Sequence, residues 1–564
     1  MRLTSLMTFF VAIASLGACT GSKEEASKSV LTIGLDQEFE SLNPTIAQMA
    51  ASSYITSMMM RSLVTIGADW QWKCVLCTEI PSFDNKKARF VTENGTRKII
   101  ADWELNPNAV WGDGTPITGH DVVFGWEVGA HPNVSVGNKD VYTRIESITV
   151  DSDNSKKFTI KYTDARYSYY QMGTFHLLPK HLEGPIFEAS KDTAGTYEKQ
   201  TLYTVRPTEA GLYSGPFILE DWKLGSHVVL KRNDKYWGDM AKLEKVIVRI
   251  VPNTQALEAN LSSGSVQMIG ELGFPLDQAL ALEKKLAQDS QLSSRFKVSM
   301  KPGLIYEHVD FNLRDPLLKD VNVRRALVLA IDRGKLTQAL FEGRQSVAHS
   351  PFHPLDVYYT DDLAKYDLDI ARAEKLLDDA GWKKGADGMR VKDGKKLSII
   401  LMSTAQNKTR ELVQAYIQEE WKKIGVAAVI RNEPARVFFG ETVRKGAYPH
   451  TALFAWVSSP DNPPESTLHS KNIPTEANSF AGQNSGAFSN KRVDEIFDAV
   501  KYEFELEKRK VLMKELAQIY ASELPVIPLY HRVEIAVIPT NLKGYEMTGH
   551  QFYSTQNIEN WYLE

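Results

Sequence analysis

The sequence predicts an α/β protein with more than one hydrophobic core. A strand over residues 397–402, a helix over 407–424 that ends at Gly425, and a strand over 426–430 form a βαβ unit. Such a unit predicts a mostly parallel sheet with helices on its faces. Apolar residues make up 43% of the 564 residues, which excludes a disordered chain. The net charge is −4, without the basic excess of a nucleic-acid binder, so we expect no nucleic-acid partner.

The N-terminus has the pattern of an export signal. A basic residue and an apolar run over residues 6–16 precede the small residues that lead to Cys19. This run is shorter than the ~20 apolar residues that a permanent membrane span needs. We therefore predict a signal peptide over 1–18, and Leu-Gly-Ala-Cys looks like a lipobox, with Cys19 as the lipidated residue. An ordinary signal peptide with a coincidental cysteine is the alternative. Polar residues 19–29 would then tether the mature chain to a membrane.

The remaining cysteines, Cys74 and Cys77, are separated by two residues. In an exported protein they form either a small local disulfide or a pair of free thiols. Zinc would need two further ligands at suitable spacing, and no nearby cysteine or histidine supplies them. His176 and His181 also lack a third ligand. We expect no metal site and no cofactor.

The elements of the first 270 residues are short. A strand is predicted over residues 30–35, a helix over 52–60, and a hairpin turn at Asn94-Gly95. Thr118 is followed three residues later by Asp121, the spacing of a capping box at the start of a helix. Further strands are expected over 218–222, 228–230 and 245–251, and a helix over 254–261 with Gly264 as its stop.

Longer elements follow in the second part of the chain. Residues 316–332 carry apolar side chains at helical spacing, with Asp320 as a cap. A second helix is expected over 366–382, and a long helix over 493–516. No motif places a nucleophile, a catalytic carboxylate pair or a phosphate loop, so we expect no enzyme activity.

Several blocks of sequence resemble, in order, the solute-binding proteins of bacterial peptide transporters. They are Trp111-Gly-Asp-Gly-Thr-Pro-Ile-Thr-Gly-His-Asp-Val-Val-Phe124, His176-Leu-Leu-Pro-Lys-His181, Arg232-Asn-Asp-Lys-Tyr-Trp-Gly238, Val321-Asn-Val-Arg-Arg-Ala-Leu327 and Leu524-Pro-Val-Ile-Pro-Leu-Tyr530. Physically, the first block is a glycine turn followed by a capped helix. The resemblance covers residues 30–564 and includes the oligopeptide- and dipeptide-binding lipoproteins of ABC importers.

The resemblance implies a two-lobed periplasmic-binding-protein fold of the α/β class, with an extra small α/β subdomain and hinge strands between the lobes. The expected boundaries are residues 30–65, 201–295 and 525–564 for lobe I, 66–200 for the subdomain, and 296–524 for lobe II.

The implied function is that of the extracytoplasmic substrate-binding component of a peptide ABC transporter. A monomer would capture an oligopeptide between its lobes and deliver it to a permease and its ATPase, on the periplasmic or extracellular face of a membrane. Two alternatives remain open. The same fold binds metal chelates, haem or sugars in relatives, and a similar lipoprotein could sense a ligand without importing it.

The resemblance also implies a ligand site around Trp456. In the family the backbone beside this tryptophan pairs with the peptide, which here involves Ala455, Trp456 and Val457. The family's aspartate three residues after the tryptophan binds the ligand's ammonium group, but Ser459 occupies that position. Because a hydroxyl cannot neutralise a buried ammonium, either Asp461 or Glu40 replaces the aspartate, or the ligand is not a peptide with a free amine.

Two other segments are expected to contribute to this site. The loop after the first strand, with Glu38, Phe39 and Glu40, lines the cleft in the resembled family. Arg444 precedes Trp456 in the sequence and is a candidate partner for a ligand carboxylate, since a guanidinium binds carboxylates bidentately. A solvated surface arginine is the alternative.

Overall fold

The computed structural model describes residues 29–137 and 139–564. The predicted signal peptide, Cys19 and all but the last residue of the predicted tether therefore lie outside the described residues. Within the described part, every helix is too short or too polar to cross a bilayer.

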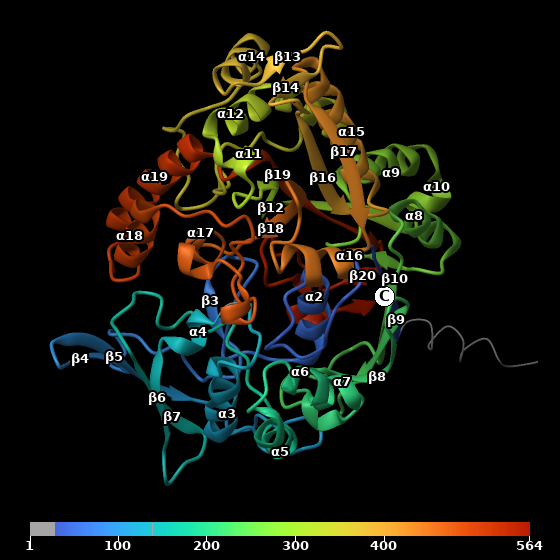
Figure 1. The fold of residues 1–564 in the computed structure, drawn as a ribbon. Coiled ribbons are helices and arrows are strands. Elements are labelled where there is room, and N and C mark those ends of the chain that lie inside the picture. The colour runs from blue at the N-terminus through green and yellow to red at the C-terminus, as the bar shows by residue number, and fades with distance from the viewer. Residues whose placement is uncertain (1–28, 138) are drawn as a thin grey trace, which may run out of the picture.

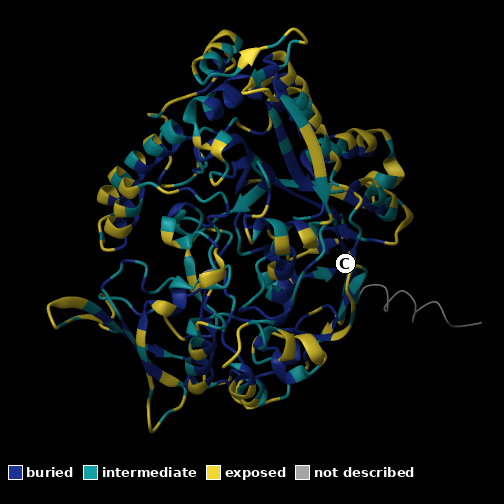
Figure 2. Cartoon of the chain, viewed as in Figure 1, coloured by how far each residue is buried: buried dark blue, intermediate teal, exposed yellow. Residues whose placement is uncertain are grey.

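A ten-stranded mixed sheet runs through the whole molecule and connects its two halves (Figure 1). Its strands, in spatial order, are β17 (Ala427–Glu433), β16 (Ser398–Thr404), β18 (Thr451–Val457), β12 (Phe296–Phe311), β19 (Val526–Pro539), β11 (Met268–Ile269), β1 (Val30–Leu35), β10 (Lys245–Ile250), β9 (His227–Arg232) and β8 (Phe217–Lys223). Figure 2 shows the central strands of this sheet as mostly buried, whereas the edge strand β17 and the outer faces of the surrounding helices carry exposed residues.

The long strands β12 and β19 belong to both halves of the sheet. They pair antiparallel over their whole length, residues 296–302 with 533–539 and residues 305–310 with 526–532. The register shifts twice along this pairing, between Pro302 and Ile305 and between Glu307 and His308. The prediction of two α/β lobes joined by hinge strands is confirmed.

The half that contains the N-terminus is built around β1. Its alternating, β-branched sequence pairs in parallel with β10 and β11, and both neighbours come more than 200 residues later in the chain. Helix α2 (Ala50–Met59) packs beside this half-sheet together with the short helix η5 (Ser554–Asn560), so the chain returns to its starting half.

A separate four-stranded antiparallel sheet extends from this half. Its order is β4 (Ala88–Glu93), β5 (Thr96–Glu104), β7 (Lys157–Tyr162) and β6 (Ile145–Val150). The turn between β4 and β5 has positive φ at Asn94 and Gly95, as the hairpin prediction requires. Helix α3 (Gly119–Ala130) begins with the predicted capping box of Thr118 and Asp121. The sheet shares one continuous hydrophobic core with the first half.

The second half contains the predicted βαβ unit. Strands β16 and β17 are parallel and are connected by helix α15 (Lys408–Lys423). Asp320 caps α12 (Val321–Leu329), as expected. The core of this half also takes in apolar residues of α8 (Thr254–Ser263) and α9 (Leu276–Gln288), two helices that the sequence analysis placed in lobe I. The domain boundaries themselves stay a prediction.

The helix predicted over residues 493–516 is wrong in one respect. It is two helices, α18 (Lys491–Val500) and α19 (Leu506–Glu523). The chain leaves the helix between them because Tyr502 donates to Asp164 at 2.8 Å and Phe504 packs edge-on to Phe83 and Phe90 of the other half. Tertiary contacts thus override the local helical pattern.

Cys74 and Cys77 form a disulfide, which settles the alternatives left open by the sequence. Cys74 belongs to β3 (Trp72–Cys74), which pairs with β2 (Val64–Ile66). The bridge therefore closes a small loop at the edge of a two-stranded hairpin.

Candidate functional site

A cavity of about 1480 Å³ lies where the two halves meet. This is larger than the ~300–1,000 Å³ of pockets for drug-sized ligands. Its wall is assembled from the loop after β1, the middle of β12, the end of β18, the helical segments over residues 434–444, and parts of 135–137, 140–144 and 166–176 in the small subdomain. A ligand inside it would touch both halves.

One wall of the cavity is the free edge of β18. This strand pairs with β12 over its whole length, but β16 pairs only with Thr451 and Ala452. The carbonyl of Leu453 points to the β16 side, where it accepts a hydrogen bond from Ser403 at 2.8 Å. Because alternate residues of a strand face the same edge, the backbone groups of Ala455 and Val457 point that way too. They have no partner among the described residues, and both residues line the cavity.

Trp456 lies between these two residues and also lines the cavity. Its ring packs edge-on to Phe454 with the ring centres 5.4 Å apart, so its position is held by the strand itself. The expected cluster of Ala455, Trp456 and Val457 is thus brought together at the cavity, with an open strand edge beside an aromatic side chain.

Ser459 and Asp461 have different surroundings. Ser459 is buried, lines the cavity and accepts a hydrogen bond from Gln551 at 3.1 Å. Asp461 is not among the lining residues. Its carboxylate forms an ion pair with Arg509 at 2.9 Å and accepts a hydrogen bond from Tyr358. Burial raises its pKa against the lowering effect of these partners, and its charge is already neutralised.

The loop after β1 contributes Glu38 to the cavity but not Phe39. Glu38 lies 3.8 Å from Arg436 of the opposite half, whereas Phe39 is buried against Trp222. Glu40 lines the cavity but is occupied, because it accepts hydrogen bonds from the backbone of Gln48 and Met49 at the start of α2. Burial raises the pKa of Glu40. A carboxylate at a helix N-terminus is stabilising, so this side chain has a structural role.

Arg444 lies on the cavity wall in the second half and donates to Ser135 of the small subdomain. Its Nε is buried without a hydrogen-bond partner. In the part of the chain that the structure describes, no carboxylate oxygen lies within 4.0 Å of the Arg444 guanidinium, so this side chain forms no ion pair. A half-buried guanidinium in this state is suited to a ligand carboxylate.

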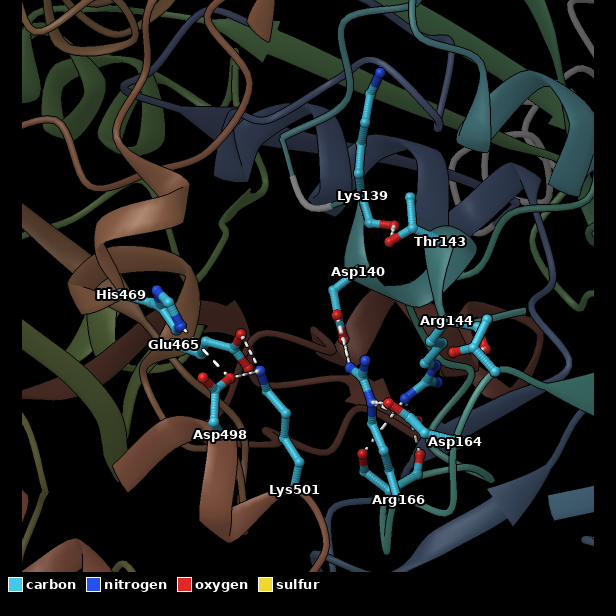
Figure 3. A network of polar contacts seen from close by, with 12 residues as sticks. Lys139, Asp140, Thr143, Arg144, Asp164, Arg166, Glu465, His469, Asp498 and Lys501 are labelled. Carbon is cyan, nitrogen blue, oxygen red and sulfur yellow. Dashed lines mark hydrogen bonds and ion pairs between the residues drawn. The ribbon is translucent and has the colours of Figure 1, made fainter. Parts of the chain in front are cut away.

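Two networks of charged residues border the cavity from opposite halves (Figure 3). In the small subdomain, Arg166 binds Asp140 at 2.7 Å and Asp164 at 2.8 Å. In the second half, Lys501 binds Glu465 at 2.9 Å and Asp498 at 3.0 Å. Each cation has two carboxylate partners in its own network, so neither Arg166 nor Lys501 is free to bind a ligand.

Asp36 and Arg410 were missed from the sequence. Asp36 directly follows β1, and Arg410 lies on α15 of the other half, where it binds Glu307 at 2.8 Å. Burial raises the pKa of Asp36 to about 6, although Arg410 and Arg532 oppose the shift. Asn407 also donates to Asp36 at 3.3 Å. No local pattern reveals this cluster, because its members are far apart in the sequence.

Known proteins share both the sequence pattern and the fold. The oligopeptide-binding protein AppA of Bacillus subtilis is 26% identical over 586 aligned positions, which cover 100% of this chain and 99% of AppA. The crystal structure of an oligopeptide-binding protein from Thermus thermophilus, complexed with a pentapeptide, is 29% identical with a TM-score of 0.86, and the match covers 95% and 96% of the two chains.

The structure of Bacillus subtilis AppA with a nonapeptide matches with a TM-score of 0.81 at 24% identity, over 95% of this chain and 99% of AppA. It shows the same fold. The model of the bacterial extracellular solute-binding proteins, family 5 (middle region), matches residues 98–476, which is more than half of the chain. The chain therefore belongs to the bacterial extracellular solute-binding proteins of family 5.

Proposed function

We propose that this protein captures oligopeptides between its two halves and delivers them to the permease and ATPase of an ABC importer. The observation that carries the proposal is the open edge of β18 at Ala455 and Val457, which faces a large cavity. An extended peptide can pair with such an edge as an added strand, and this pairing does not depend on the peptide's sequence. The named relatives that bind peptides support the same ligand class.

The ends of the ligand add a second requirement. Arg444 is available for the carboxylate of a peptide, since it lines the cavity without a carboxylate partner in the described residues. Closure of the halves would bury this pair and strengthen it. We further propose that Cys19 is lipidated, that the protein is a monomer, and that it catalyses no reaction. The lipid would hold the protein on the outer face of the membrane that contains the permease.

Calorimetric titration of the mature protein with random tetra- to nonapeptide pools tests the proposal. We expect saturable binding. Trp456→Ala should weaken it about tenfold, because the variant loses aromatic contact area beside the open strand edge. Tyr359→Ala removes an exposed aromatic residue outside the cavity wall and should leave the affinity unchanged.

Failure of every pool to bind or to raise the melting temperature would rule out peptides as the ligand. Mass spectrometry of molecules that co-purify with the protein would then identify the solute. A metal chelate, haem or sugar in that fraction would contradict peptide capture.

A further inference from the structure

A peptide at neutral pH brings charged groups into the cavity, and burying an unpaired charge costs several kcal/mol. The cavity must therefore supply partners for a cationic as well as an anionic group. Arg444 suits the anion. A cationic group needs a carboxylate that has no partner of its own.

Most acidic side chains on the cavity wall already have a partner. Ion pairs join Glu559 to Arg61, Asp140 to Arg166, Glu465 to Lys501 and Glu38 to Arg436. Glu40 caps α2, and Asp36 is close enough to Arg410 and Arg532 that both lower its pKa. Using any of these groups for a ligand would break an existing interaction.

Of the remaining acidic residues on the wall, four form no ion pair among the described residues, namely Glu198, Asp239, Glu271 and Asp356. The unpartnered Oε2 atoms of Glu198 and Glu271 are shielded from solvent, and Asp239 is exposed to it. Asp356 is therefore the candidate. It lies in the loop before α14 (Ile370–Asp379) and lines the cavity beside Pro351 and Phe352. Its Oδ1 accepts the backbone N–H of Tyr358 at 2.9 Å, while Oδ2 has no hydrogen-bond partner in the residues described. Nor does any lysine, arginine or histidine nitrogen of residues 29–137 and 139–564 lie within 4.0 Å of the carboxylate.

The electrostatics of Asp356 agree with this geometry. Burial raises its pKa to about 6, and the negative charge of Asp461 adds to the shift, with no cation to offset it. Asp461 itself is neutralised by Arg509 and accepts from Tyr358. Asp461 is thus paired and lies off the cavity wall, whereas Asp356 is unpaired and lies on it.

The loop also holds Asp356 in place before any ligand arrives. Its backbone N–H donates to the carbonyl of His353 at 2.7 Å, and Tyr358 is anchored through its hydroxyl to Asp461. Phe352 is buried against Tyr358 with the ring centres 6.0 Å apart. A carboxylate on such a fixed loop pays little ordering entropy when it binds a cation.

We propose that Asp356 binds a cationic group of the ligand, an inference that rests on the proposed peptide capture. This group is either the terminal ammonium or the side chain of a lysine or arginine, and both would form the same charge-assisted hydrogen bond to Oδ2. The role that the sequence suggested for Asp461 or Glu40 thus falls to a residue about 100 positions upstream of Trp456.

The test uses one synthetic pentapeptide with a single internal lysine, chosen as the tightest binder from the peptide pools. It is prepared with a free amine, with an acetylated amine, and with norleucine in place of lysine. Calorimetry at pH 7.5 measures the three forms on the wild type, on Asp356→Asn and on Asp367→Asn. Asp367 is an exposed carboxylate in the same loop before α14 but does not line the cavity, so its variant is a matched control.

We expect Asp356→Asn to bind the unmodified peptide at least tenfold more weakly, and Asp367→Asn to bind it within twofold of the wild type. Either acetylation or norleucine replacement of the peptide should weaken its binding to the wild type about as much as Asp356→Asn does. The same modification should not weaken peptide binding to Asp356→Asn any further. Loss on acetylation identifies the terminal ammonium, and loss on norleucine replacement identifies the lysine side chain. The melting temperature of Asp356→Asn should not fall, since the variant removes an uncompensated charge.

Equal binding of all three peptide forms by wild type and Asp356→Asn would overturn the inference while leaving peptide capture intact. A lower melting temperature together with equal weakening of all three forms would also overturn it, because that pattern indicates a purely structural loop residue. If the wild type binds no peptide at all, the proposed function fails and this inference fails with it.

Discussion

Glu271 and Glu534 show how burial changes the pKa of individual carboxyl groups. Both are buried in the first half, near the hydroxyls of Tyr54 and Tyr545. Burial raises the pKa of Glu271 to about 7, and burial together with the charge of Glu271 raises that of Glu534. Two neighbouring buried carboxyls favour states in which at least one of them is protonated.

This pair makes stability depend on pH. Because the pKa of Glu271 is higher in the folded than in the unfolded protein, the folded state holds a proton that the unfolded state releases. Its contribution to stability is complete below about pH 4.5 and is lost as the pH rises through about 7. Glu271→Gln should therefore raise the melting temperature by several degrees at pH 8 and have little effect at pH 4.5.

The measurement is differential scanning calorimetry at both pH values. Glu419→Gln on the surface of α15 is the control, since the side chain of Glu419 is 67% exposed, and its melting temperature should follow the wild type. A stabilisation by Glu271→Gln of equal size at both pH values would contradict a titrating group.

Residue contacts were predictable when the partners are close in the sequence. Thr118 and Asp121 form the expected capping box because a helix start brings positions three apart together. Asp461 and Arg509 are 48 positions apart, and neither has a local signal of pairing. The sequence therefore pointed to Asp461 as a free carboxylate, and only the fold revealed its partner.

At the scale of elements, the loop after β18 depends on α19. Asp461 adopts a left-handed conformation with φ of 52°, and Arg509 from the first turn of α19 holds its carboxylate. Removing one member of a buried ion pair leaves the other without a partner, which costs roughly 3–5 kcal/mol when both are fully buried. The side chain of Asp461 is 25% exposed, so solvent reduces that cost.

We expect Arg509→Met to destabilise the protein by about 2 kcal/mol in urea unfolding. Adding Asp461→Asn should recover part of this loss, because the unpaired charge is gone. Arg492→Met breaks an exposed pair with Glu515 on neighbouring helices and should leave the free energy of unfolding close to that of the wild type. A double variant as unstable as Arg509→Met alone would show that the ion pair is not the cause.

Element prediction succeeded where one local pattern decides the structure. The βαβ unit, the hairpin at Asn94-Gly95 and the stop at Gly264 are all present. The long helix over 493–516 failed because Tyr502 and Phe504 gain contacts with the small subdomain that no local pattern encodes. The free edge of β18 was likewise out of reach from the sequence, since it depends on where β16 stops pairing.

At the scale of the whole molecule, the two halves touch outside the hinge through Tyr167 of the small subdomain. Its backbone N–H donates to the carbonyl of Lys501 at 3.0 Å, and its ring lies 3.8 Å from the guanidinium carbon of Arg509. Its hydroxyl donates to the carbonyl of Asp461 at 3.4 Å. These contacts hold the halves together at one side of the cavity.

Tyr167→Ala should shift the ligand-free protein toward a more open arrangement, because the closed one loses these contacts. Small-angle X-ray scattering should show a larger radius of gyration than for the wild type. Tyr562→Ala, at the end of the chain and away from the contact between the halves, should scatter like the wild type. An unchanged radius for Tyr167→Ala would mean that other contacts set the closure.

The path of β12 and β19 through the sheet has a consequence for how the protein is made. Strand β12 pairs with β19 along its length. Strand β19 also pairs with β11, and β11 in turn pairs with β1. A chain that emerges from the ribosome N-terminus first cannot complete either half until residues 526–539 have been synthesised. Closing such distant contacts is slow. The main sheet thus stays incomplete until the end of synthesis, a condition that favours export of the chain through a narrow translocation channel.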